Sequence, residues 1–102
     1  MAIDKNIEIK KKDASDWFRS LRDDFCKTFE DLDSKKFSRK LWDHKGKGGG
    51  EMSIMRGEVF EKVGVNISTV SGEFSEDYRE QVKGTSKSPK YWASGISLVA
   101  HM

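Results

Sequence analysis

The sequence is poor in the residues that usually reveal a covalent or membrane-bound architecture. It has one cysteine and one proline among 102 residues. The single cysteine, Cys26, excludes an internal disulfide and a zinc knuckle built from paired cysteines. No apolar run approaches the ~20 residues that a membrane span needs, and the N-terminus has no signal-peptide core. These absences predict a cytoplasmic protein without a membrane span.

A dominant charge of one sign is also missing. The formal net charge is +2, from 19 basic and 17 acidic residues. The Lys10-Lys11-Lys12 run lacks the interleaved aromatic residues of a nucleic-acid-binding stripe and is typical of solvated surface. Hydrophobic residues make up only 35% of the chain, which is enough for one domain with a modest core. Because the net charge is small and no basic-aromatic stripe is present, we expect no nucleic-acid partner.

What the sequence does contain begins with a helical pattern. Apolar residues recur at steps of three and four from Asp13 onward, which predicts an amphipathic helix over residues 13–33 that packs on a sheet. Asp13 is the expected N-cap, and residues 1–11 are expected to form a loose arm. The predicted stripe consists of Ala14, Trp17, Phe18, Leu21, Phe25, Phe29 and Leu32.

Residues 37–70 are expected to form strands with a glycine-rich loop. Four glycines occur in the six residues from Lys45 to Gly50, a density that is entropically costly in a regular element. Further on, a strand places one face toward the core. That face carries Val63, Val65, Ile67 and Thr69. Residues 71–90 are expected to form a long connection, with helical turns around residues 76–82.

Residues 91–102, from Tyr91 to Met102, are expected to form the last strand. Its packed face would carry Trp92, Ile96, Leu98 and Ala100, and its other face Ser97, Val99 and His101. Strands do not alternate with helices in the manner of parallel sheets, so the predicted fold class is α+β with antiparallel pairing. Because the sequence stops within this expected strand, we expect residues 1–102 to be a single incomplete domain.

The glycine run does not fit a nucleotide site. A phosphate-binding loop needs Ser or Thr after Gly-Lys at the start of a helix, whereas Gly48 follows Lys47 here. The dinucleotide fingerprint also fails, because Glu51 stands in the place of its last glycine. A turn or a close backbone contact is the simpler interpretation.

Ser97 and His101 are the remaining candidates for chemistry. They lie four residues apart on the expected last strand, on the same side and ~13 Å from each other. This arrangement is compatible with a pocket wall, but by geometry alone a solvent-exposed face is the better interpretation. The other histidine, His44, is far away in sequence and makes no metal-binding pattern with His101.

Several ordered blocks of the sequence resemble one enzyme family. They are Trp42 followed by Gly48-Gly49-Gly50, the segment Gly57 to Ser68 with its Val59-Phe60-Glu61-Lys62 core, and Gly95-Ile96-Ser97-Leu98-Val99-Ala100-His101. The helix with Phe25-Cys26 and Leu32-Asp33 is similar to the family's opening helix. Together these blocks resemble the amino-terminal part of oxygen-dependent coproporphyrinogen III oxidases.

The resemblance implies a reaction and a set of site residues. These enzymes convert two propionates of coproporphyrinogen III to vinyl groups with molecular oxygen, giving protoporphyrinogen IX in haem biosynthesis. As a rule no organic or redox-metal cofactor is needed, although a divalent metal has been proposed for some members. Ser97 matches a substrate-binding serine, and His101 matches a proposed metal ligand. The implied architecture is a large antiparallel sheet flanked by helices, assembled as a homodimer.

The family's next motif, His-x-Asn-x-Arg, does not occur in this sequence. That motif supplies the proposed proton donor and a carboxylate-binding arginine, and the resemblance places it just beyond Met102. We therefore expect no catalytic residue within residues 1–102, and an amino-terminal part that is inactive alone. An alternative remains open: a non-catalytic module from a truncated paralogue that binds a tetrapyrrole or dimerises.

Overall fold

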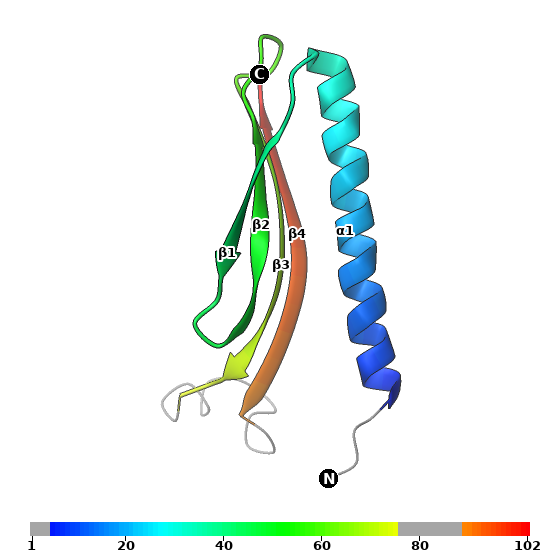
Figure 1. Cartoon of the computed structure of the whole chain (residues 1–102), viewed down its shortest axis with the longest axis vertical. Coiled ribbons are helices and arrows are strands. Elements are labelled where there is room, and N and C mark those ends of the chain that lie inside the picture. The colour runs from blue at the N-terminus through cyan, green and yellow to red at the C-terminus, as the bar shows by residue number, and fades with distance from the viewer. Residues whose placement is uncertain (1–4, 76–88) are drawn as a thin grey trace.

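The computed structural model describes residues 5–75 and 89–102, which form one helix followed by four strands (Figure 1). The elements are α1 (Lys5–Asp33), β1 (Ser38–Asp43), β2 (Lys47–Met55), β3 (Lys62–Glu73) and β4 (Lys90–His101). The strands pair in the order β1-β2-β3-β4, and every neighbouring pair is antiparallel. The predicted α+β class is confirmed. The helical turns expected around residues 76–82 lie outside the described residues.

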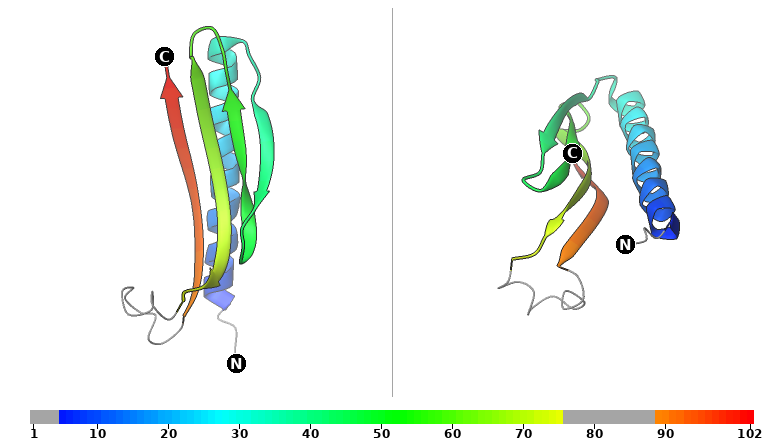
Figure 2. Two further views of the ribbon diagram at one scale, coloured as in Figure 1. Left: turned by 90° about the vertical axis from the view of Figure 1, so that its left-hand side faces the viewer. Right: turned by 60° about the horizontal axis from the view of Figure 1, so that its bottom comes forward.

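The molecule has two layers. The helix runs along one face of the twisted sheet, closest to β3 and β4 (Figure 1, Figure 2). No other described element covers the opposite face of the sheet. We call the strand positions that point toward α1 the helix face and those that point away the outer face.

The helix begins earlier than the sequence pattern indicates. It starts at Lys5, so residues 5–11 are helical and the prediction of a loose arm is wrong for them. Asp13 is accordingly inside the helix and not its N-cap. The first turns bury little apolar surface, which is why hydrophobic periodicity missed them. Exposed ion pairs such as Lys12 with Asp16, 2.6 Å apart, connect successive turns, as is common on helix surfaces.

The buried face of α1 also differs from the predicted apolar stripe. The buried residues are Arg22, Cys26 and Asp33, whereas Trp17 and Leu32 are 62% and 61% exposed. Arg22 pairs with Glu51 of β2, and Asp33 binds the backbone of the β2–β3 connection. These polar contacts hold the helix in a rotation that leaves one flank of its apolar stripe in solvent.

The core lies between the C-terminal half of α1 and the helix face of β2 and β3. Val63, Val65 and Ile67 are buried on one side of β3, so the predicted alternation of this strand is confirmed. The buried cluster consists of Cys26, Met55, Val63 and Val65, with Phe25, Phe29, Phe37, Phe60 and Ile96 packed against it.

The glycine run belongs to a strand rather than to a loop. β2 already begins at Lys47, and the β1–β2 turn closes with His44 N–H donating to the Gly48 carbonyl at 2.9 Å. Gly48 has a φ of 88°, in the left-handed region that favours glycine. At Gly50, a side chain would collide with the ring of Trp42 from the neighbouring strand. Close packing, not flexibility, explains these glycines.

The last two strands are longer than predicted at one end. β3 continues to Glu73 and β4 starts at Lys90, so residues 71–73 and 90 belong to the sheet and not to the connection. On the helix face of β4, Ile96 packs on the core, but Leu98 and Ala100 are exposed. The prediction that these two pack is wrong, because β4 is the edge of the described sheet and nothing beyond it shields them.

At its other end, β4 is one residue shorter than predicted. The strand ends at His101, so Met102 lies outside it and the prediction that the strand includes Met102 is wrong. The physical reason is the register, which closes with the pair Lys62 and His101 at the start of β3. Beyond this pair the β3 ladder offers Met102 no partner, and its side chain is 81% exposed.

Candidate functional site

The two faces of the sheet are distinguished by contacts to α1. Ser15 shares a hydrogen bond with Thr69 of β3 at 3.3 Å, and Arg22 reaches Glu51 of β2. These partners, together with the buried positions Val63, Val65 and Ile67, mark the helix face. Since side chains alternate along a strand, Ser97 and His101 lie on the outer face. The predicted placement of the pair on one side of β4 is confirmed by the register.

Ser97 lies directly opposite Asn66 of β3. The Asn66 Nδ2 group donates to Ser97 Oγ at 3.5 Å. The same row continues across the sheet through Met52 of β2 to Lys40 of β1. Ser97 therefore belongs to a row of outer-face side chains that crosses all four strands, and it is exposed.

His101 lies at the other end of this surface, opposite Lys62. Its carbonyl accepts a hydrogen bond of 2.8 Å from the backbone N–H of Glu61. This bond ties the end of β4 to the start of β3 and fixes the backbone from which the imidazole extends. His101 is exposed.

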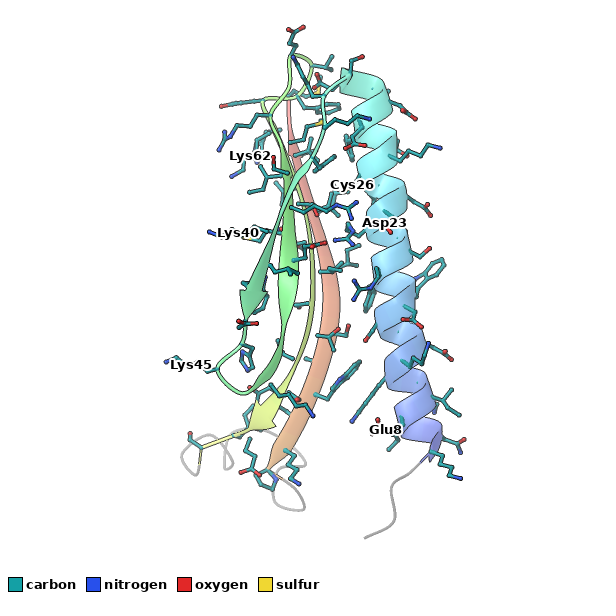
Figure 3. The ribbon with its side chains drawn as sticks, viewed as in Figure 1. Glu8, Asp23, Cys26, Lys40, Lys45 and Lys62 are labelled. Atoms are coloured by element: carbon teal, nitrogen blue, oxygen red, sulfur yellow. The ribbon has the colours of Figure 1, made fainter. Side chains whose placement is uncertain are left out.

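The outer-face positions of the strands include lysines. Lys40 and Lys62 project away from the helix, in contrast to Cys26, which lies between helix and sheet (Figure 3). Among the outer-face positions of the four described strands there is no Asp or Glu, because Asp43, Glu51 and Glu73 all fall on the helix face. A surface of this kind attracts anions.

Two hollows of the described chain lie elsewhere. They lie between α1 and the helix face, with volumes of about 840 and 400 Å³, and share Ser15, Gly48 and Thr69 in their walls. Neither includes Ser97 or His101. Ser97 and His101 instead lie on the outer face, which no other described element covers (Figure 2).

The structure does not bring the two histidines together. His44 Nε2 forms a 2.8 Å hydrogen bond with the hydroxyl of Tyr91, at the start of β4, whereas His101 ends that strand. Within residues 5–75 and 89–102, no three His, Cys, Asp or Glu side chains cluster as metal ligands would. His101 thus offers a single exposed imidazole, and these residues do not form a metal site by themselves.

Three buried titratable groups have shifted pKa values, and all belong to the helix packing. Burial raises the pKa of the Cys26 thiol, which makes a reactive thiolate rarer. Backbone hydrogen bonds, foremost from Phe60, lower the pKa of Asp33. Burial opposes the charge of Arg22, yet hydrogen bonds to Asp23 and Glu51 outweigh it and raise its pKa. These shifts accompany structural contacts and indicate no proton-transfer group.

Sequence reasoning missed Asn66. An asparagine in an alternating strand pattern has no distinctive signal of its own, and only the β3–β4 register places it against Ser97. Pairing the buried valines of β3 with the apolar positions of β4 excludes a slip by one residue, which would turn β4 over, but a slip by two residues keeps the same faces and gives Asn66 another partner.

Comparison with known proteins shows the family of the chain. Residues 13–102 match the family model described as coproporphyrinogen III oxidase. The chain belongs to the coproporphyrinogen III oxidase family. It is 51% identical to the oxygen-dependent coproporphyrinogen-III oxidase of Rickettsia felis over 107 aligned positions. The corresponding proteins of Rickettsia akari and Rickettsia bellii are 50% and 48% identical.

The match covers nearly the whole chain but a minor part of each relative. The alignment to the Rickettsia felis protein includes 94% of this chain and 38% of that protein. For Rickettsia bellii the two shares are 96% and 37%. Within the described residues of this coproporphyrinogen III oxidase family member, no helix is long and apolar enough to cross a membrane.

Proposed function

We propose that this chain provides a substrate-binding part of an oxygen-dependent coproporphyrinogen III oxidase. The reaction converts two propionates of coproporphyrinogen III to vinyl groups with molecular oxygen as the oxidant. The observation that carries the proposal is the position of Ser97 on an outer face that has lysines but no acidic side chain among its described positions. That surface suits a ligand that carries several carboxylates.

Ser97 would act as a hydrogen-bond donor to one propionate. A bond from a hydroxyl to a carboxylate is stronger than a bond between neutral groups, and it would fix the position of the macrocycle's edge. Lys40 and Lys62 would add longer-range attraction. The neighbouring row contains Ser68 and Gly95, whose small size would let the macrocycle approach this part of the sheet closely.

The chain supplies no group for the chemical step itself. The His-x-Asn-x-Arg motif is absent from residues 1–102, and the proposal places the catalytic groups in a segment beyond Met102. We therefore infer that the isolated chain binds without turning over its substrate. Both hypotheses, an amino-terminal part of the oxidase and a non-catalytic tetrapyrrole-binding module, therefore predict that the isolated chain binds the ligand without converting it.

Three further features of the assembled enzyme belong to the proposal. His101 would contribute one ligand if a divalent metal is bound, with the other ligands coming from groups not found among the described residues. We also propose a homodimer in the cytoplasm. The uncovered outer face and the open edge of β4 offer surface for such an assembly.

Titration of the 102-residue chain with coproporphyrin III, the stable oxidised form of the substrate, tests the binding role. Fluorescence of the porphyrin would report the dissociation constant. Ser97→Ala should weaken binding about tenfold, the effect of losing one hydrogen bond to a charged group. Ser38→Ala is the matched control, because Ser38 is an exposed outer-face serine on β1, at the far edge of the sheet, and should leave binding unchanged.

Two results would count against the proposal. One is equal binding by the wild-type chain and Ser97→Ala. The other is formation of vinyl product when the isolated chain is incubated aerobically with coproporphyrinogen III, which would contradict the inference that the chain lacks the catalytic groups.

A further inference from the structure

We propose that Asn66 is a positioning residue that fixes the Ser97 hydroxyl as a donor toward a substrate carboxylate. This inference rests on the proposed function of Ser97 as a carboxylate-binding residue. It assigns a role to a side chain that does not itself need to touch the reacting atoms.

The geometry places the Asn66 amide where it can act on Ser97. Asn66 stands on β3, an inner strand paired on both sides, opposite Met52 of β2 and Ser97 of β4. Its backbone is therefore held by two ladders of hydrogen bonds. From this fixed base, Nδ2 donates to Ser97 Oγ at 3.5 Å.

The chemistry of a hydroxyl explains what this bond does. A serine hydroxyl has one O–H donor and two acceptor lone pairs, and its hydrogen rotates to suit its partners. When an amide N–H occupies one lone pair, the O–H cannot point at that group and is directed elsewhere. A carboxylate only accepts hydrogen bonds, so Ser97 can bind one only through its O–H. Asn66 thus selects the orientation that a carboxylate requires.

The other end of the amide indicates that Asn66 is not optimised for stability. Asn66 Oδ1 is shielded from solvent and has no hydrogen-bond partner among the described residues. An unsatisfied buried acceptor is unfavourable for folding, and an apolar side chain at this inner position would avoid it. Its presence is explained if the Nδ2 group has a task at Ser97.

Space for a ligand exists beside this pair. Gly64 precedes Asn66 on the same face of β3, and a methyl group built there would find Asn66 Nδ2 at 3.9 Å as its nearest neighbour. At Gly95, next to Ser97 on the same face of β4, a methyl group would meet nothing within 4 Å. A carboxylate can therefore reach the Ser97 hydroxyl without displacing a side chain.

A double-mutant cycle in the 102-residue chain tests the inference. Asn66→Ala removes the donor without adding a charge beside the ligand, so the Ser97 O–H is no longer directed. Coproporphyrin III affinity should fall severalfold for Asn66→Ala and about tenfold for Ser97→Ala. Asn66→Ala combined with Ser97→Ala should bind no more weakly than Ser97→Ala, since both changes remove one interaction. Additive losses would overturn the proposal.

The control variant and a second ligand separate positioning from a general structural effect. Met52→Leu alters the neighbour on the other side of Asn66 while conserving volume, and it should leave affinity within about twofold. The tetramethyl ester of coproporphyrin III lacks the anionic carboxylates, so Asn66→Ala should weaken its binding much less than that of the free acid. Equal weakening of both ligands would contradict the assignment.

A measurement without ligand keeps the two proposals distinguishable. In NMR spectra of the chain, Ser97→Ala should shift the side-chain amide resonances of Asn66, and Ser38→Ala should not. Failure of the wild-type chain to bind coproporphyrin III would contradict the proposed function and, with it, the role of Asn66. Binding that depends on Ser97 but is unaffected in Asn66→Ala would contradict the role of Asn66 alone.

Discussion

Asp33 Oδ2 accepts a hydrogen bond of 2.8 Å from the backbone N–H of Phe60. The same carboxylate accepts bonds from the N–H groups of Glu58 at 2.8 Å and Val59 at 3.1 Å. The last residue of α1 thereby holds the connection between β2 and β3, and it brings Phe60 edge-on to Phe29 at a centroid distance of 5.1 Å. The family-identifying segment around Val59 and Phe60 is thus a structural device that docks the helix on the sheet.

Removing the charge of Asp33 should change how stability depends on pH. Its pKa is lowered by the backbone bonds, so the folded state binds a proton less readily than the unfolded state, whose Asp pKa is about 3.9. The resulting stabilisation is present above that value and is lost as the pH falls through the lowered pKa. Asp33→Asn should therefore be less stable than wild type at pH 7, with a smaller difference at pH 3.

Urea denaturation at the two pH values measures this effect. Asp31→Asn is the control, because Asp31 is an exposed aspartate in the same helical turn and its replacement should change stability little. A stability difference between wild type and Asp33→Asn that is the same at pH 7 and pH 3 would contradict the assignment.

Gly57 should not tolerate a side chain. A methyl group at this position would overlap the Asp33 carboxylate, so Gly57→Ala should destabilise the fold by about 1–3 kcal/mol, as overpacking does. At Gly95 a methyl group meets nothing within 4 Å, and Gly95→Ala should be neutral or slightly stabilising in thermal unfolding. Equal melting temperatures for the two variants would be inconsistent with this packing.

The two faces of the sheet should respond differently to the same truncation. Val65 is fully buried on the helix face of β3, whereas Val99 is 55% exposed on the outer face of β4. Val65→Ala leaves a cavity in the core and should cost about 2 kcal/mol. Val99→Ala should stay within about 0.5 kcal/mol. Chemical denaturation of both variants gives the comparison, and a larger loss for Val99 would reverse the assignment of faces.

Arg22 should be essential for helix docking. Its side chain is 3% exposed and pairs with Glu51 at 19% exposure and with Asp23. Arg22→Ala removes the partner of a largely buried carboxylate and should destabilise the fold by about 3 kcal/mol. Arg19→Ala, at an exposed position one turn earlier, is the control and should change stability little. Similar unfolding midpoints for the two variants would show that the buried pair is dispensable.

Cys26 should be protected in the native state. The side chain is buried at 2% exposure, and burial raises the pKa of its thiol. Iodoacetamide near pH 7.5 should therefore modify it only slowly, and rapidly once urea unfolds the chain. Mass spectrometry follows the single alkylation. Equal rates in the two conditions would place Cys26 at the surface.

Elements with a clear hydrophobic period were predicted from the sequence, and elements without one were not. The β3 face of Val63, Val65 and Ile67 was predicted because an inner strand that is buried on one side must alternate. The start of α1 was missed because its first turns are polar and exposed. The glycines of β2 suggested a loop, since their role is to let Trp42 and neighbouring backbone approach, and that contact is non-local.

The candidate site was likewise predicted only in part from the sequence. The sequence placed Ser97 and His101 on one side of a strand, through strand alternation alone. It also placed this pair opposite the apolar face that carries Ile96, which packs on the core. Only the contacts of Arg22 and Ser15 identify α1 as the layer over that apolar face. The sequence could not reveal Asn66, which acquires its partner only through the β3–β4 register.

The sequence by itself determined the family, the α+β class and the alternation of the strands, because these follow from local spacing and from ordered motifs. The tertiary structure alone decided the rotation of α1 and the pairing of Ser97 with Asn66. Those features depend on buried polar contacts and strand register between residues far apart in the chain. Such contacts are selected by the free energy of the assembled layers, which no local pattern encodes.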